Sequence, residues 1–247
     1  MKFNSLEELL TFVNKLKILG YGSQGKTFYD INSNKVFKIY YDALDGELAD
    51  CTKTSYEVLR FKDCLNKTYV FAFDAILLND IAVGYIEKKA PGKIINQINP
   101  LNINLDKFIS SVSKVDEDVV KISKYKIKTH DVLYNIMYGN GKISIIDFDE
   151  YVYTNKDYDS LLALNRKNFN MGIKLFLVDT YFDEFVASNK YLNELYKDKN
   201  IDINLFLSMF KKYICEYMDY DITKLNEAKK LLNKKKHKEN FVREYKI

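Results

Sequence analysis

The chain has 247 residues, of which 47% are apolar, and its formal net charge is +4. This length and apolar share are those of an ordinary globular protein and exclude a disordered chain, and the small charge does not favour nucleic acid as a partner. We expect neither membrane insertion nor a signal peptide. Cys51, Cys64 and Cys215 lack metal-ligand spacing, so reduced thiols in a cytoplasmic protein are expected.

The first predicted element is a helix at residues 5–13, SLEELLTFV. A serine that precedes two glutamates and a periodic apolar face is typical of a helix start. This pattern predicts a capped amphipathic helix.

Three glycines follow, at positions 20, 22 and 25 in the stretch ILGYGSQGKT. A lone G-x-G-x-x-G is weak evidence, because dinucleotide-binding loops share this spacing. The residues after Gly25 are β-branched and aromatic, which predicts a strand, and a turn at residues 32–34 leads to another strand that carries Lys38. The glycines fit either a plain tight hairpin or a loop whose amides lie against phosphates that Lys38 also reaches.

The next elements lead from a strand-rich part to a helical part. A buried lysine needs a carboxylate partner, and the helical segment at residues 55–62 contains Glu57. Pro91 and Gly92 mark the expected crossing into the second part. About forty residues separate Ala90 from His130, which leaves room for one short and one long helix; the long helix is predicted at residues 105–123.

Polar residues gather in the stretch from residue 128 to 149. It predicts a loop with Asp131 and Asn135, a tight glycine turn at residues 139–141, and a strand that ends in Asp147. Carboxylate and amide oxygens suit a magnesium ion bound to a nucleotide. Further helices are predicted over residues 161–182, 205–217 and 222–232, and the basic run at 234–238 is interpreted as a solvated helix end.

The order of five features along the chain resembles the protein-kinase-like fold. They are the glycine loop, the strand lysine, the helix glutamate, the His-Asp loop and Ile-Asp-Phe-Asp at residues 146–149. That fold also includes the aminoglycoside and choline phosphotransferases. The resemblance spans residues 20–149 and suggests a small bacterial or phage type. It implies an α+β fold with two lobes: a small antiparallel β lobe with one main helix at residues 1–90, and a mainly helical lobe at residues 91–247.

The resemblance also implies the site residues for ATP, for Mg²⁺ and for catalysis. The nucleotide-binding positions are Gly20, Gly22, Gly25, Lys38, Glu87, Lys88 and Ala90. The metal-binding positions are Asn135 and Asp147. The catalytic positions are Asp131, which accepts or orients the acceptor hydroxyl, and Lys38, which pairs with Glu57. The residues implied to pack between the lobes are Phe61, His130 and Phe148.

The sequence departs from the family pattern in the catalytic loop. Only three residues separate Asp131 from Asn135, where protein kinases have four. Either the loop is contracted around Asp131, or an alignment anchored on Asn135 puts His130 where the base belongs. We favour Asp131, because a histidine would add positive charge near magnesium. Asp149 replaces a glycine and is either a second metal ligand or a turn residue.

These features predict an ATP-dependent phosphotransferase with a nucleotide and a protein or small-alcohol acceptor as partners. Three hypotheses follow in order: a minimal protein kinase, a small-molecule kinase of the aminoglycoside or choline type, and a nucleotide-binding pseudokinase. The short stretch between residues 90 and 130 opposes the second, because it leaves no room for a helical insertion that would build an acceptor pocket. The presence of Lys38, Glu57, Asn135 and Asp147 opposes the third.

Overall fold

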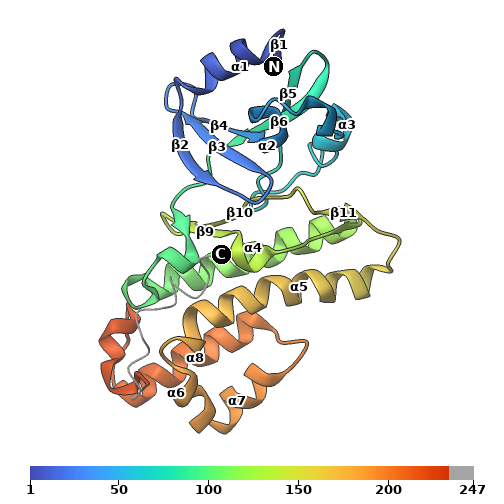
Figure 1. Cartoon of the computed structure of the whole chain (residues 1–247). Helices are drawn as coiled ribbons and strands as arrows, with labels where there is room; N and C mark the ends of the chain where they lie inside the picture. Colours follow the sequence, from blue (N-terminus) through green and yellow to red (C-terminus); the bar gives the residue numbers. More distant parts are fainter. Residues whose placement is uncertain (234–247) are drawn as a thin grey trace. The chain divides into compact units, whose positions relative to one another are not determined.

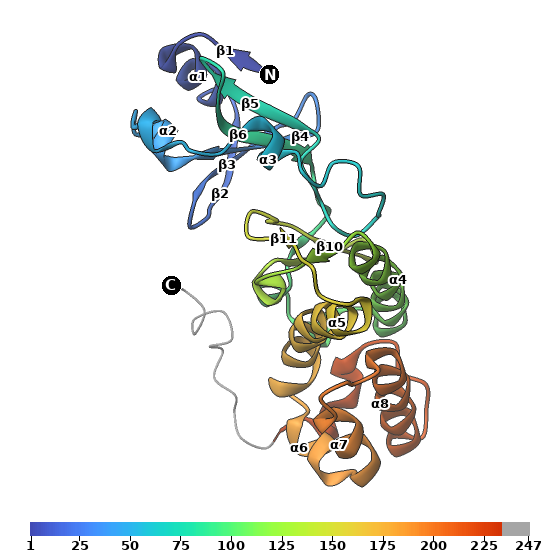
Figure 2. The same ribbon diagram turned by 90° about the vertical axis from the view of Figure 1, so that its right-hand side faces the viewer.

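The computed structural model describes residues 1–233, which fall into two compact units (Figures 1 and 2). The N-terminal unit contains Met1–Leu65 and Val70–Ala90. The C-terminal unit contains Asn66–Tyr69 and the described chain from Pro91 onward. The basic run at residues 234–238 lies outside the described residues.

A six-stranded sheet forms the N-terminal unit, in the order β1-β5-β6-β4-β3-β2. The pair β1 and β5 is parallel and all other neighbours are antiparallel. The predicted glycine hairpin is the connection from β2 to β3, and Lys38 lies on β4. The strands are β1 (Lys2–Phe3), β2 (Lys17–Tyr21), β3 (Gly25–Asp30), β4 (Lys35–Tyr40), β5 (Asp74–Leu78) and β6 (Ile81–Lys88).

The predicted N-terminal helix is confirmed as α1 (Leu6–Val13). Oγ of Ser5 accepts a hydrogen bond from the backbone N of Glu8, and Leu9 and Val13 are buried in the core on the sheet. The predicted helix at residues 55–62 is a single turn, so α1 is the main helix of this unit. The shorter elements are α2 (Tyr41–Leu44), η1 (Leu48–Asp50) and α3 (Ser55–Val58).

The C-terminal unit is built around α4 (Leu105–Lys124), which confirms the predicted long helix. Its buried residues recur every three or four positions, from Leu105 and Phe108 to Ile122, and form one apolar face. This face lets α4 pack against α5 (Tyr158–Lys174) and α8 (Ile203–Met218), as Figure 2 shows. The helical core of this unit therefore follows from the apolar period of the sequence.

The predicted helix over residues 205–217 is confirmed as α8, whereas two other predicted helices agree with the structure in place but not in length. The predicted helix over residues 161–182 is α5 followed by a π-helical turn, η5 (Leu175–Asp179). The segment at residues 222–232 forms a 3₁₀ helix, η6 (Leu225–Leu231). The other short elements are α6 (Asp183–Ser188), α7 (Lys190–Lys197), η2 (Ile95–Gln97), η3 (Pro100–Asn102) and η4 (Val132–Tyr134).

Two small sheets frame the predicted loop. The hairpin of β9 (Ile136–Gly139) and β10 (Lys142–Ile145) is extended by β7 (Lys93–Ile94), while β8 (Ile127–Lys128) pairs with β11 (Val152–Tyr153). Asn140 and Gly141 have φ of 54° and 68°, as a two-residue hairpin loop requires. The predicted glycine turn is thus confirmed. Within residues 1–233, no helix combines the length and the apolar character needed to cross a membrane.

Candidate functional site

Lys38 is fixed by strand pairing in the N-terminal unit. It lies opposite Thr27 of β3 and Tyr85 of β6, and only 5% of the residue is exposed. Its Nζ lies 5.7 Å from the centroid of the Tyr85 ring, within the range of a cation–π interaction. The sheet therefore holds this cation in a largely dehydrated place, where its charge acts strongly on a nearby anion.

The three glycines of the β2–β3 turn differ in what the fold requires of them. A Cβ atom on Gly25 would lie 2.3 Å from the carbonyl oxygen of Ile39 in β4, so no side chain fits there. A Cβ atom on Gly20 would have no neighbour within 4 Å. The N–H of Gly22 donates to the carbonyl of Gly25 at 2.9 Å and closes the turn. Gly25 is thus needed for sheet packing, whereas Gly20 is not.

Lys53 is a second cation beside this turn, and it was not predicted from the sequence. Its Nζ donates to Oε1 of Gln24 at 3.1 Å and lies 4.5 Å from the centroid of the Tyr40 ring. Tyr41 also contacts the turn, because its hydroxyl donates to the carbonyl of Gly22 at 3.1 Å. No motif marks Lys53, which lies in the irregular stretch before α3; only the folded chain brings it to the glycines.

The predicted ion pair between Lys38 and Glu57 is wrong. In the described chain, Oε2 of Glu57 accepts hydrogen bonds from the backbone N and the hydroxyl of Thr54, at 2.7 and 2.8 Å. Thr54 Oγ1 in turn accepts from the backbone N of Glu57, which completes a capping box. The hydrogen bonds from Thr54 lower the pKa of the Glu57 carboxyl. The local cap holds Glu57 on Thr54, and its side chain is exposed.

The predicted adenine-binding edge lies at the end of β6. Glu87 and Lys88 are paired with β4, whereas the ladder between β5 and β6 extends only to Ile86. The main chain of Glu87 and Lys88 thus passes the end of β5. Ala90, two residues beyond the strand, is buried, and Nζ of Lys89 donates to its carbonyl at 3.4 Å.

In the C-terminal unit, one buried amide anchors the start of the predicted loop. Asn165 of α5 is fully buried, and its Oδ1 accepts hydrogen bonds from the backbone N and the hydroxyl of Thr129, each at 3.0 Å. Its Nδ2 donates to two acceptors in the stretch from the end of α4 to β8, at 3.0 and 2.9 Å. Asn168 adds a bond from Nδ2 to the carbonyl of Thr129 at 3.1 Å. The backbone two residues before Asp131 is therefore held by α5.

Asn135 joins Asp131 to the strand end that carries Asp147. Its Nδ2 donates to the carbonyl of Asp131 at 3.1 Å, and its own carbonyl accepts from the backbone N of Ile146 at 3.1 Å. This hydrogen bond orients the amide, and Oδ1 is its atom that could bind a metal ion. Hydrogen bonds to main-chain groups thus connect Asn135 with Asp131 and with the residue before Asp147.

Asp131 and Asp147 share a left-handed backbone conformation, with φ of 46° and 61°. Such a conformation costs free energy for a residue other than glycine and is concentrated at functional sites. Neither residue lies in a hairpin turn or after a helix. The other described non-glycine residues with positive φ do: Asn34, Asn79, Asp80, Lys126, Asn140 and Asp219.

The same two carboxylates act on one buried phenol. Tyr151 is 1% exposed, and burial raises the pKa of its hydroxyl. The negative charges of Asp147 and Asp131 raise this pKa further, because both oppose ionisation of the phenol. Asp131 and Asp147 therefore lie within electrostatic reach of a common neighbour.

The side chain of His130 is 51% exposed. Its Nδ1 lies 2.7 Å from Oε2 of Glu150 and 3.4 Å from Oδ1 of Asp131. A ligand atom from each of the three residues lies within 4.8 Å of the others. Glu150 was not predicted from the sequence. Its one signal is that it directly follows Ile-Asp-Phe-Asp, in the segment between β10 and β11.

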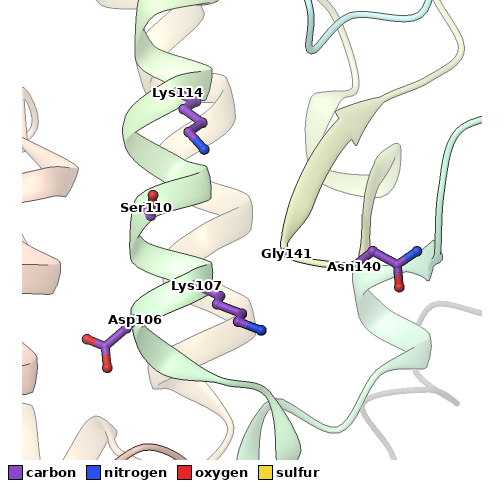
Figure 3. Close-up of a pocket in the computed structure, with 6 residues that line it drawn as sticks. All are labelled: Asp106, Lys107, Ser110, Lys114, Asn140 and Gly141. Atoms are coloured by element: carbon purple, nitrogen blue, oxygen red, sulfur yellow. The ribbon is translucent and has the colours of Figure 1, made fainter.

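A groove of about 370 Å³ lies between α4 and the β9–β10 turn (Figure 3). None of the predicted site residues lines it. The lining residues are Asp106, Lys107, Ser110, Lys114, Asn140 and Gly141.

Two crystal structures of the PknI kinase domain from Mycobacterium tuberculosis are similar to the chain. Both have a TM-score of 0.50, with 11% and 12% sequence identity, and each match covers 79% of this chain and 93% of the kinase domain. The chain has a protein-kinase-like fold. No protein-family profile and no curated protein sequence matches it.

The predicted fold class is confirmed: the chain is α+β, with a strand-rich first part and a helical second part, as in the protein-kinase-like fold. At this level of identity the likeness establishes the fold and not the activity. The roles of individual residues therefore rest on their geometry.

Proposed function

We propose that this protein is an ATP-dependent phosphotransferase, which moves the γ-phosphate of ATP to a hydroxyl group. The observation that carries the proposal is the bonding around Asn135, whose side chain binds the Asp131 carbonyl and whose carbonyl binds the residue before Asp147. A loop with a carboxylate and a strand end with a second carboxylate are thereby held together. Phosphoryl transfer depends mainly on such positioning and on charge neutralisation.

The proposed metal site consists of Asn135 and Asp147. The proposed ligand oxygens are the amide Oδ1 of Asn135 and a carboxylate oxygen of the half-buried Asp147. Oxygen ligands of this kind fit Mg²⁺, which keeps several waters and binds one or two protein oxygens beside phosphates. When bound, Mg²⁺ neutralises phosphate charge. Asp131 orients the acceptor hydroxyl.

The proposed phosphate site in the N-terminal unit is formed by Lys38 with the turn of Gly20, Gly22 and Gly25. A buried lysine acts as a point charge on phosphate oxygens. Lys53, bonded to Gln24 of this turn, supplies a further positive charge. The proposed adenine contacts are main-chain groups of Glu87, Lys88 and Ala90, next to the end of the β5 ladder.

We propose a protein hydroxyl as the acceptor. Between Ala90 and His130 the structure has β7, two 3₁₀ turns and α4, then β8, without an inserted helical subdomain that would enclose a small alcohol. A small-alcohol acceptor is the second candidate. It is favoured by the short segment from residue 150 to 157 before α5, which leaves little chain for a peptide-docking platform.

Transfer from γ-labelled ATP with Mg²⁺ tests the proposal. Wild type is compared with Asp131→Ala and Asp147→Asn, and with Asp159→Asn as a control at an exposed position of α5. Cell lysate and a panel of small alcohols serve as acceptors. Label on protein that disappears in the two site variants and remains in the control supports the proposal.

Label on an alcohol alone moves the assignment to the second candidate. ATP binding without transfer to any acceptor overturns the proposed activity and makes a nucleotide-binding pseudokinase the better description. Asp147→Asn should also remove the magnesium-dependent part of ATP binding.

A further inference from the structure

The imidazole of His130 lies beside two carboxylates, and both face the same ring nitrogen. Nδ1 is 2.7 Å from Oε2 of Glu150 and 3.4 Å from Oδ1 of Asp131. An ionised carboxylate only accepts hydrogen bonds, so Nδ1 is the donor at the shorter distance. In the neutral ring the other nitrogen, Nε2, then carries a lone pair and accepts a proton.

The backbone next to both residues of this contact, His130 and Glu150, is fixed by hydrogen bonds. His130 follows Thr129, which α5 binds through Asn165. Glu150 lies between two buried aromatic residues, Phe148 and Tyr151, and the backbone N of Tyr151 donates to the carbonyl of Phe148 at 2.9 Å. The fold thus fixes the approach of Glu150 to the ring, although the ring itself is half exposed.

We propose that His130 is the proton acceptor in phosphoryl transfer and that Glu150 is the positioning residue that orients its ring. This inference rests on the proposed function. His130 stands five residues before Asn135, the interval at which the base is expected when the loop is anchored on Asn135. The objection that a histidine adds positive charge near magnesium is met by Glu150 and Asp131, because two carboxylates compensate an imidazolium.

The proposed step moves one proton and one phosphoryl group. The acceptor oxygen forms a bond to the γ-phosphorus, and the bond from this phosphorus to the bridging oxygen breaks, with its electron pair staying on ADP. The hydroxyl proton moves to Nε2 of His130. The resulting imidazolium keeps its Nδ1–H directed at Glu150, an arrangement in which a third group orients and stabilises the base.

A first test reads the tautomer and does not depend on activity. The chain has two histidines, so a long-range ¹H–¹⁵N spectrum of the neutral rings contains two sets of signals, and His130→Asn assigns one of them. We expect the Nδ1–H form for His130 in wild type and the Nε2–H form, which free imidazole side chains favour in water, in Glu150→Ala. The Nε2–H form in wild type would overturn the proposal.

A second test measures ATP turnover with Mg²⁺ and with water as the acceptor. His130→Asn should lower kcat by about 10²–10⁴-fold at unchanged KM for ATP, the range that general acid–base catalysis contributes. Glu150→Gln should cause a smaller loss of kcat of the same kind. Glu117→Gln, at an exposed position on α4, should leave turnover unchanged.

Chemical rescue separates a proton acceptor from a structural residue. Because the ring is half exposed, imidazole added to His130→Ala should restore part of the turnover, and it should not restore Lys38→Met. If wild type turns over ATP and His130→Asn has the same kcat, this inference is contradicted and the proposed function is not. Absence of any wild-type transfer removes the proposed function, and this inference falls with it.

Discussion

The two units hold their predicted site residues by different means. In the N-terminal unit, Lys38 is held by main-chain register, between Thr27 and Tyr85 on the neighbouring strands. In the C-terminal unit, Asp131 and Asp147 lie in irregular chain, and side-chain hydrogen bonds from Asn135 and Asn165 fix the surrounding backbone. A strand position follows from local pattern, whereas a loop position depends on partners far along the chain.

This difference predicts where each unit is sensitive to substitution. The position of Lys38 should depend on residues that set the spacing of the strands. The positions of Asp131 and Asp147 should depend on buried polar groups. The four predictions below test the contrast, beginning with the largest expected effect.

Lys38→Met should lower ATP turnover by about 10²–10³-fold, the loss that follows removal of one preorganised electrostatic group. The fold should persist, because methionine fills a similar volume and needs no charge compensation in a buried place. Turnover and thermal unfolding are the measurements. Lys35→Met is the matched control, since Lys35 lies on the same strand and is exposed. Equal turnover in both variants would remove Lys38 from the site.

Gly25→Ala should destabilise the protein by about 1–3 kcal/mol, because the new methyl group meets the Ile39 carbonyl of β4 and the backbone must shift. Gly20→Ala should change the free energy of unfolding by less than about 0.5 kcal/mol, because its Cβ meets open space. Urea unfolding of the two variants measures both values. If Gly20 covers a phosphate, Gly20→Ala should weaken ATP binding in a protein of normal stability; unchanged binding would exclude that role.

The buried carboxylate of Asp118 should make the C-terminal unit sensitive to acid. Burial acts to raise its pKa, but hydrogen bonds from Lys121, Thr68 and the backbone of Lys67 outweigh this effect and lower the pKa. Since the folded-state pKa is the lower one, the carboxylate stabilises the fold fully above the unfolded value of about 3.9. That contribution is lost as the pH falls from there through the folded-state pKa.

Urea unfolding of wild type and Asp118→Asn across this pH range checks the prediction. The stability difference between the two proteins should shrink as the pH falls. A difference that stays constant would show that Asp118 does not titrate with unfolding.

Glu57→Gln should have the smallest effect, with ATP turnover close to that of wild type. The Glu57 carboxylate binds Thr54 at the start of α3, and its side chain is exposed. The measurement is the same turnover assay as for Lys38→Met. A loss as large as that of Lys38→Met would show that the two residues act as a pair during catalysis, contrary to their positions in the structure.

Much of the fold was predictable because it follows from periodic patterns. The serine before an amphipathic segment predicted α1, the apolar period predicted α4, and Asn140 with Gly141 predicted the β9–β10 turn. The length of α3 was not predictable from helix propensity, which favoured a helix over residues 55–62, whereas only Ser55–Val58 form one. For the site, the identities of the predicted residues came from motif order, while Lys53 and Glu150 carry no motif of their own.

By itself, the sequence determined which segments become strands, helices and turns, because these depend on the spacing of apolar residues and on turn-forming residues nearby. It also placed Lys38 on a strand and Asp147 at a strand end. Only the tertiary structure decided that Lys53 reaches the glycine turn and that Glu150 meets His130. These contacts depend on the three-dimensional path of irregular chain, which local pattern does not specify.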